Sequence, residues 1–113
     1  MIIEDRDKSY LQRMLEYCER IEEAKQRFGT TFEQYIEDAD YRDVVCMNIF
    51  QIGELANQIS DETQNKLKDI PWAQMYAIRN ILAHAYIKID DKIVWDTIEN
   101  DIPKLKERLK EIV

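Results

Sequence analysis

The fold is decided by residues 41–59, which read YRDVVCMNIFQIGELANQI. Apolar side chains recur in this stretch at alternating spacings of four and three, which is typical of an α-helix with one buried seam. These side chains are Val45, Ile49, Ile52, Ala56 and Ile59. Gly53 interrupts the helix at a cost of about 1 kcal/mol relative to alanine. Such a glycine commonly permits close approach of another helix or of a ligand.

Helical patterns continue upstream of this stretch. Apolar residues at helical spacing predict a first helix from Asp5 to Arg27. Gly29 then supplies a C-terminal stop. Thr31 and Gln34 have the spacing of a capping box, which predicts a short helix over Phe32–Asp38.

Two further helical elements are predicted downstream. A short capped turn begins at Ser60 and ends at Asp69, and Pro71 then suits the first turn of a helix that reaches His84. The last element begins near Asp90 and continues to the C-terminus. We expect Pro103 to kink or restart it, because an interior proline removes a backbone hydrogen bond.

Composition agrees with a helical domain. The chain has 113 residues, 45% hydrophobic and 35% charged, which suits amphipathic helices in a single domain spanning 1–113. Only two glycines and two prolines are present, too few for the turns of an all-β fold. The sequence therefore predicts an all-α bundle of four main helices with a short extra turn or two.

Composition also limits the possible partners. Cys18 and Cys46 lie in apolar-periodic runs and are expected to be reduced, buried thiols. One histidine and two scattered cysteines cannot supply a conventional zinc site within one chain, and no cofactor is expected. The N-terminus lacks the pattern of a signal peptide, and no apolar run is long enough to span a membrane. We therefore expect a cytoplasmic protein.

The charge distribution is uneven. The formal net charge of −7 argues against a general nucleic-acid coat protein. The twenty residues from Ile70 to Ile89 nevertheless contain no Asp or Glu, although the overall composition predicts roughly four. Arg79, His84 and Lys88 lie in this window. A locally non-acidic pocket would explain the pattern, and so would burial of the segment.

The most informative segment is residues 79–86, which read RNILAHAY. A helix turns about 100° per residue, so Asn80 and His84 share a face, as do Arg79 and Tyr86 if the helix reaches that far. Arg79 and His84 differ by about 140°. Their side chains converge only if His84 lies at a loosened helix end, or if a second subunit contributes.

These side-chain types suit phosphodiester chemistry. The guanidinium of Arg79 can grip phosphate oxygens, and His84 can move a proton near neutral pH. Tyr86 offers a hydroxyl for positioning or for modification. Acid–base cleavage of RNA uses one base and one acid, yet the chain has one histidine. The second group could be His84 of a two-fold dimer, a different acid, or water held by the substrate.

Purely structural roles would explain the same residues. A histidine near a helix end often hydrogen-bonds the terminal carbonyl groups. Tyr86 could be a core tyrosine with a solvated hydroxyl. The residue types by themselves therefore do not establish an enzyme.

A family resemblance favours the enzymatic interpretation. Arg79-Asn80 followed by His84 resembles the motif of HEPN domains, in which four to six residues separate arginine and histidine. The further spacing to Tyr86 resembles the HepT branch of that family. Asn48–Ala56, Ile70–Trp72, Val94-Trp95 and Ile102-Pro103 are similar to the same family in matching order. The resemblance thus covers nearly the whole chain.

The resemblance implies a four-to-five-helix, up-and-down bundle of HEPN type that forms a homodimer. It implies a metal-independent ribonuclease that cleaves tRNA or mRNA, with Arg79 and His84 as the catalytic residues and without a DNA or membrane partner. Such a protein is the toxin of a type VII-like toxin–antitoxin pair. Its partner, a MntA-type nucleotidyltransferase, transfers AMP from ATP to the tyrosine that is Tyr86 here. The added phosphate and bulk would block RNA entry.

Three further residues are candidates for positioning the substrate. Asn80 directly follows Arg79, and Glu54 and Gln51 lie close to Gly53 in the sequence. We expect Glu54 and Gln51 to face the cleft and to hydrogen-bond Arg79 or the substrate. A solvated helix face is the alternative for this pair.

Two non-enzymatic functions compete with the ribonuclease. In the first, the helical dimer is a docking or binding subunit for a separate nucleotidyltransferase, and Arg79 holds a nucleotide phosphate. The net negative charge favours this function, because it repels free RNA at long range. In the second, the chain is a structural interaction bundle in which His84 and Tyr86 only cap and pack.

Overall fold

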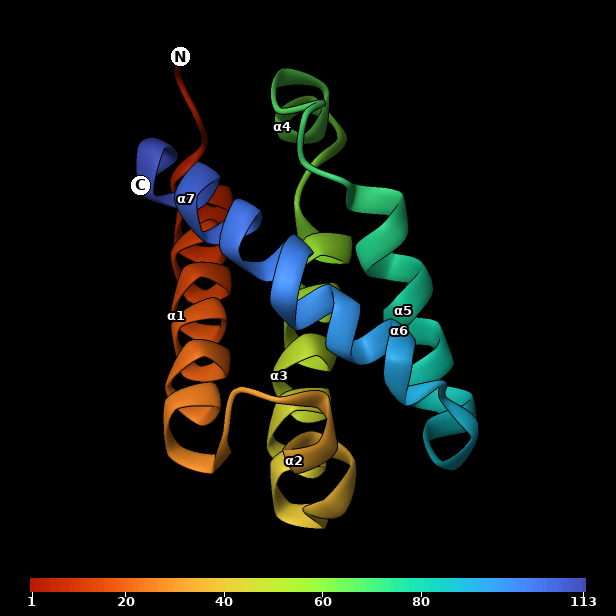
Figure 1. The fold of residues 1–113 in the computed structure, drawn as a ribbon. Helices are drawn as coiled ribbons and strands as arrows, with labels where there is room; N and C mark the ends of the chain where they lie inside the picture. The colour runs from red at the N-terminus through yellow and green to blue at the C-terminus, as the bar shows by residue number, and fades with distance from the viewer.

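The computed structural model describes all residues from 1 to 113, and every regular element in it is helical, which confirms the all-α prediction. The elements are α1 (Asp5–Phe28), α2 (Phe32–Glu37), α3 (Ala39–Gln58), α4 (Asp61–Lys66), α5 (Trp72–Ala85), the 3₁₀ turn η1 (Tyr86–Lys88), α6 (Asp91–Asp96), the π-helical turn η2 (Thr97–Asp101) and α7 (Ile102–Ile112). Helices α1, α3 and α5 run down, up and down beside one another (Figure 1). The segment from α6 to α7 crosses this layer obliquely and ends against α1 (Figure 1).

Helix α3 is the centre of the bundle, with α1 packed along one side and α5 along the other. The predicted apolar seam of α3 forms the middle of the core, since all five of its side chains are at most 3% exposed. These side chains are Val45, Ile49, Ile52, Ala56 and Ile59. The spacing of apolar residues in the sequence therefore predicted correctly which face of α3 is covered by α1 and α5.

Short polar signals set the first helix boundaries. Gly29 ends α1 with a φ of +137°, in the region that favours glycine. Thr31 and Gln34 form the predicted capping box at the start of α2. Helix α3 begins two residues earlier than expected because the carboxylate of Asp38 accepts hydrogen bonds from the backbone N–H groups of Asp40 and Tyr41.

The C-terminal helical segment is interrupted and begins again next to Pro103, as the sequence predicted. Helix α6 passes into the π-helical turn η2 at Thr97–Asp101, and α7 then begins at Ile102 with Pro103 in its first turn. A proline fits there because the first N–H groups of a helix have no carbonyl partner within that helix.

Helix α5 is the least buried of the long helices. Only Met75 and Leu82 are buried among its fourteen residues. Tyr76 and Ile81 are 40% and 44% exposed. Burial therefore does not explain why this segment lacks acidic residues, and the non-acidic surface is a feature of the folded protein. No helix in the bundle combines the length and apolarity needed to cross a membrane.

Candidate active site

The site is built where α3 and α5 approach most closely. A Cβ placed on Gly53 of α3 would lie 2.4 Å from Cβ of Arg79 and 2.8 Å from the backbone oxygen of Met75 on α5. Only glycine fits such a contact without displacing the neighbouring helix. The predicted close approach at Gly53 is therefore confirmed, and it positions Arg79 against α3.

Arg79 is held by three neighbours. Its Nε donates to Oε1 of Glu54 in an ion pair, and its Nη1 donates to Oδ1 of Asn80 over 2.9 Å. Its guanidinium carbon lies 5.3 Å from the ring centre of Phe50. Two of the five guanidinium N–H groups are thus used, and the others remain able to bind phosphate. The expected hydrogen bond between Glu54 and Arg79 is confirmed.

His84 projects from a different side of α5. It is exposed and lies within regular helix, one residue before α5 ends. No hydrogen bond or ion pair joins it to Arg79, and the angular separation of about 140° expected for a regular helix is retained. The backbone leaves helical geometry only after His84, at Ala85 (φ −145°, ψ 39°), and no contact between His84 and Arg79 results. A single chain therefore presents Arg79 and His84 as neighbours on one helix rather than as a closed pair.

Tyr86 lies just beyond α5, at the first position of η1. Its hydroxyl donates a hydrogen bond to Oδ1 of Asp43, and the guanidinium of Arg42 lies 5.6 Å from its ring centre. Partial burial and, second to it, the hydrogen bond to Asp43 together raise the pKa of Tyr86 to about 12. The phenol is therefore protonated at neutral pH, with a carboxylate directly on its oxygen.

Asp43 and Phe50 were not predicted as site residues. The contact between Asp43 and Tyr86 joins positions 43 residues apart, and no spacing rule within one helix can indicate it. Phe50 lies in α3 off the apolar seam, and a large aromatic residue at such a position was the available sequence signal for a partner outside that seam; its ring is partly buried in the structure. Both residues reach the site only because α3 and α5 pack side by side.

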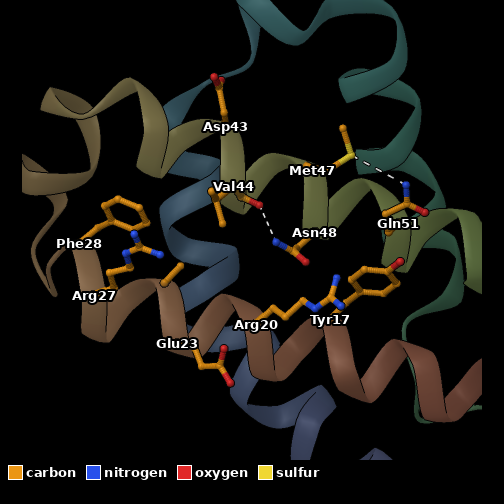
Figure 2. A pocket seen from close by; sticks show the side chains of 11 residues that line it. Tyr17, Arg20, Glu23, Arg27, Phe28, Asp43, Val44, Met47, Asn48 and Gln51 are labelled. Atoms are coloured by element: carbon orange, nitrogen blue, oxygen red, sulfur yellow. Dashed lines mark hydrogen bonds between the residues drawn. The ribbon is translucent and has the colours of Figure 1, made fainter.

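Gln51 faces a different surface from Glu54. It lines a groove of about 920 Å³ between α1 and α3, where its Nε2 donates to Sδ of Met47 over 3.8 Å (Figure 2). It has no contact with Arg79. The structure thus places Glu54 on the α5 side of α3 and Gln51 on the α1 side.

A smaller hollow of about 560 Å³ lies between α3 and α5 beside Tyr86. Its lining is mostly apolar and includes Met47, Phe50 and Leu82. No group of three or more His, Cys, Asp or Glu side chains is arranged to hold a metal ion. The charged side chain that lines this hollow is Asp43, and Arg79 lies outside its lining.

Known proteins are similar in sequence to this chain over most of its length. The family model "Ribonuclease HepT-like" matches residues 14–112. "Putative RNase TTE0752" of Caldanaerobacter subterraneus subsp. tengcongensis is 31% identical over 105 residues, which cover 92% of this chain and 91% of that protein. "Probable ribonuclease HepT" of Thermococcus cleftensis is 31% identical over 105 residues, which cover 93% and 94%. No solved structure gives a significant match. The chain belongs to the HepT-like ribonuclease family.

Proposed function

We propose that this protein is a metal-independent endoribonuclease, the toxin of a type VII-like toxin–antitoxin pair, which cleaves tRNA or mRNA. The observation that carries the proposal is the environment of Arg79. Its guanidinium is fixed by Glu54 and Asn80 and keeps free N–H groups, and the exposed His84 follows about one and a half turns later. The family relationship supports the same activity.

In this mechanism Arg79 binds the oxygens of the phosphate that is attacked. His84 takes the proton from the 2′-hydroxyl, whose oxygen forms a new bond to phosphorus. The bond from phosphorus to the 5′-oxygen breaks, and that oxygen receives a proton from an acid. The products are a 2′,3′-cyclic phosphate and a 5′-hydroxyl end. Arg79 offsets the extra negative charge of the pentacoordinate state.

A homodimer supplies the missing acid in this proposal. The chain has one histidine, so a second copy of His84 at the same cleft gives one base and one acid. The outward side of α5 suits such an interface, because its centre carries Ala73 and Ala77 and its two edges carry the half-exposed Tyr76 and Ile81. Packing α5 against its symmetry mate would bring both motifs to one cleft.

Tyr86 is the proposed point of control. A MntA-type nucleotidyltransferase would catalyse attack of the phenol oxygen on the α-phosphorus of ATP, and pyrophosphate would leave. Asp43 is placed to accept the phenol proton as the new bond forms. The AMP group adds negative charge and bulk just past the end of α5, which opposes binding of RNA phosphates.

The decisive experiment is cleavage of tRNA and mRNA by purified protein in EDTA. We expect the wild type to cleave and Arg79→Ala or His84→Ala to lose at least about 100-fold in rate. Gln26→Ala, an exposed change on α1, is the matched control and should leave the rate unchanged. Wild-type activity retained by both site variants would disprove the catalytic assignment.

The same experiment separates the ribonuclease from a docking subunit. The net charge of −7 is the observation that favours docking, because free RNA is repelled at long range. If the wild type leaves RNA intact but forms a complex with the nucleotidyltransferase that Arg79→Ala abolishes, the docking function is correct.

A further inference from the structure

Helix α1 carries an arginine at every seventh position. The four residues are Arg6, Arg13, Arg20 and Arg27, and they are four of the seven arginines in the chain. Seven residues rise about 10.5 Å and drift only about 20° around a helix. The four side chains therefore form one stripe about 31 Å long, which we call the arginine stripe.

No carboxylate neutralises this stripe. Glu16 and Glu23 precede Arg20 and Arg27 by four residues, the usual spacing of a helical ion pair, yet neither pair is among the eight ion pairs of the structure. The other three arginines of the chain are all paired with carboxylates. On an acidic protein, the unpaired arginines are thus collected on one helix.

Aromatic rings accompany the stripe. The guanidinium carbons of Arg6, Arg20 and Arg27 lie 5.4, 5.2 and 5.3 Å from the ring centres of Tyr10, Tyr17 and Phe28. Each guanidinium is therefore supported by a ring while its N–H groups remain free of protein carboxylates. Flat cationic and aromatic side chains in a row are the features that bind single-stranded nucleic acid, through phosphate contacts and base stacking.

The stripe borders the groove between α1 and α3. Arg20, Arg27 and Tyr17 line the α1 wall, and Asn48 lines the α3 wall opposite them (Figure 2). Asn48 is only 8% exposed; its Nδ2 donates to the backbone oxygen of Val44 over 2.7 Å. Its amide oxygen has no hydrogen-bond partner in the protein and points toward α1 (Figure 2). This unpartnered acceptor thus faces Arg20 and Arg27 across an open groove, whose lining also includes Glu23.

The groove adjoins the hollow beside Tyr86. Asp43 and Met47 line both this groove and the hollow beside Tyr86. A strand lying in the groove can therefore cross α3 at Met47 and reach the hollow between α3 and α5. The proposed dimer contact lies on the outward side of α5, away from α1, so it leaves the groove open.

We propose that the arginine stripe and the α1–α3 groove bind the part of a single-stranded RNA that flanks the cleaved bond. The proposal rests on the ribonuclease function above. Arg20 and Arg27 bind phosphates, the ring of Tyr17 and the guanidinium planes stack bases, and the Asn48 oxygen accepts from the amino group of a base. The strand is single because a double helix is too wide for a groove between two packed helices and hides its base edges.

Binding is measured with a 5′-fluorescein-labelled 20-nucleotide RNA by anisotropy, in a His84→Ala background that prevents cleavage. The Arg20→Gln/Arg27→Gln variant should bind at least about tenfold more weakly at 50 mM salt, and the slope of log K against log salt should fall by about 1.4, or 0.7 for each lost phosphate contact. Lys104→Gln/Lys110→Gln on α7 makes the same charge change and should alter affinity less than about twofold.

Cleavage kinetics give a second measurement with His84 intact. The arginine variant should show a raised KM on the 20-mer with kcat nearly unchanged, and unchanged kcat/KM on a dinucleotide, which cannot occupy groove and site together. Circular dichroism and thermal unfolding should match the wild type, because the changed side chains lie on the surface.

Each alternative result identifies which idea fails. If the arginine variant binds the 20-mer as tightly as the lysine control, the groove proposal is wrong, while wild-type cleavage would still establish the ribonuclease. If it keeps RNA affinity but loses its complex with the nucleotidyltransferase, the stripe is a protein-docking surface and the proposal is overturned. If the wild type binds RNA at the groove but does not cleave it, only the ribonuclease function fails.

Discussion

The hydroxyl of Tyr86 is hydrogen-bonded to the carboxylate of Asp43, and this bond affects how readily the phenol loses its proton. The phenol donates to the carboxylate, and burial together with this bond raises the pKa of Tyr86 to about 12. A protonated phenol is a weak nucleophile, so group transfer to its oxygen needs a base that removes the proton. In the proposed adenylylation, Asp43 is that base, because its carboxylate already accepts the phenol hydrogen bond.

Asp43→Asn should slow adenylylation of Tyr86 by about 100-fold, the usual size of a general-base contribution. The phenol pKa should fall only part of the way toward its ordinary value, because burial, its largest cause, remains. The rate is measured by mass spectrometry after incubation with a MntA-type nucleotidyltransferase and ATP. Tyr86→Phe should remain unmodified, and an unchanged rate in Asp43→Asn would exclude Asp43 as the base.

Asp7 shows how one buried carboxylate can connect distant parts of the chain. It is 2% exposed, and it accepts hydrogen bonds from the backbone N–H of Ser60 (3.2 Å) and from the hydroxyls of Ser60 (2.5 Å) and Thr63 (2.6 Å). Burial raises the pKa of Asp7, but these hydrogen bonds outweigh burial, and the pKa lies below its ordinary value. The start of α1 is thereby tied to the start of α4.

Asp7→Asn should lower the free energy of unfolding at pH 7 by about 1–3 kcal/mol, because the amide satisfies fewer of the three donors. A lowered pKa stabilises the fold above the unfolded-state pKa of about 3.9, and this contribution is lost as pH falls through the folded-state pKa. Urea unfolding should therefore show a smaller difference between the two proteins at pH 3. Asp5→Asn, exposed in the same turn, should have little effect at either pH.

At the scale of elements, the contact between α3 and α5 determines where Arg79, the proposed catalytic arginine, lies. Gly53 allows the two helices to touch through backbone and Cβ atoms, and Glu54 then pairs with Arg79. Helix α3 is the main packing partner of α5, and the segment from α6 to α7 contacts α5 more lightly, through the hydrogen bond from Gln74 to Asp101. The packing of α5 against α3 therefore holds α5 in place and orients Arg79.

Gly53→Ala should destabilise the protein by about 1–3 kcal/mol, although alanine gains about 1 kcal/mol in helix propensity. The added methyl group would lie 2.8 Å from a backbone oxygen of Met75, which can move only with α5. The rate of RNA cleavage should fall by more than the loss of folded protein explains, because the added methyl group displaces Arg79. Asn57→Ala, exposed on the same helix, is the control for both urea unfolding and cleavage. A more stable Gly53→Ala variant would contradict the packing argument.

At the scale of the whole molecule, the bundle leaves the outward side of one long helix, α5, exposed to solvent. The outward side of α5 presents half-exposed apolar side chains beside Asn80 and His84, in a segment without acidic residues. An exposed apolar patch next to polar functional groups is a common feature of interaction surfaces. We therefore place the proposed dimer contact on this side of α5.

Ile81→Glu should convert the dimer to a monomer and abolish RNA cleavage while the helical content is retained. The reason is that Ile81 is 44% exposed in the monomer, so a carboxylate there is solvated in one chain and buried without a partner between two. Light scattering coupled to size exclusion measures the mass. Ile36→Glu on α2, 49% exposed, should change neither mass nor activity. A monomeric Ile81→Glu protein that still cleaves would show that one chain is sufficient.

Local and periodic features were determined by the sequence alone. The seam of α3, the stop at Gly29, the capping box of Thr31 and Gln34, and the restart near Pro103 all depend on residues within about one or two turns of one another. Interactions over so short a range follow from the backbone geometry of a helix. The same holds for the spacing of Arg79, His84 and Tyr86, which carried the family resemblance.

Contacts between helices were decided only by the tertiary structure. Glu54 and Gln51 are three residues apart, yet α5 packs against one and the α1–α3 groove contains the other. The bond between Asp43 and Tyr86 joins α3 to η1, and neither residue indicates the other by its position in the sequence. The physical reason is that helix periodicity defines the faces of each helix, whereas the packing of the whole chain determines which neighbour covers each face.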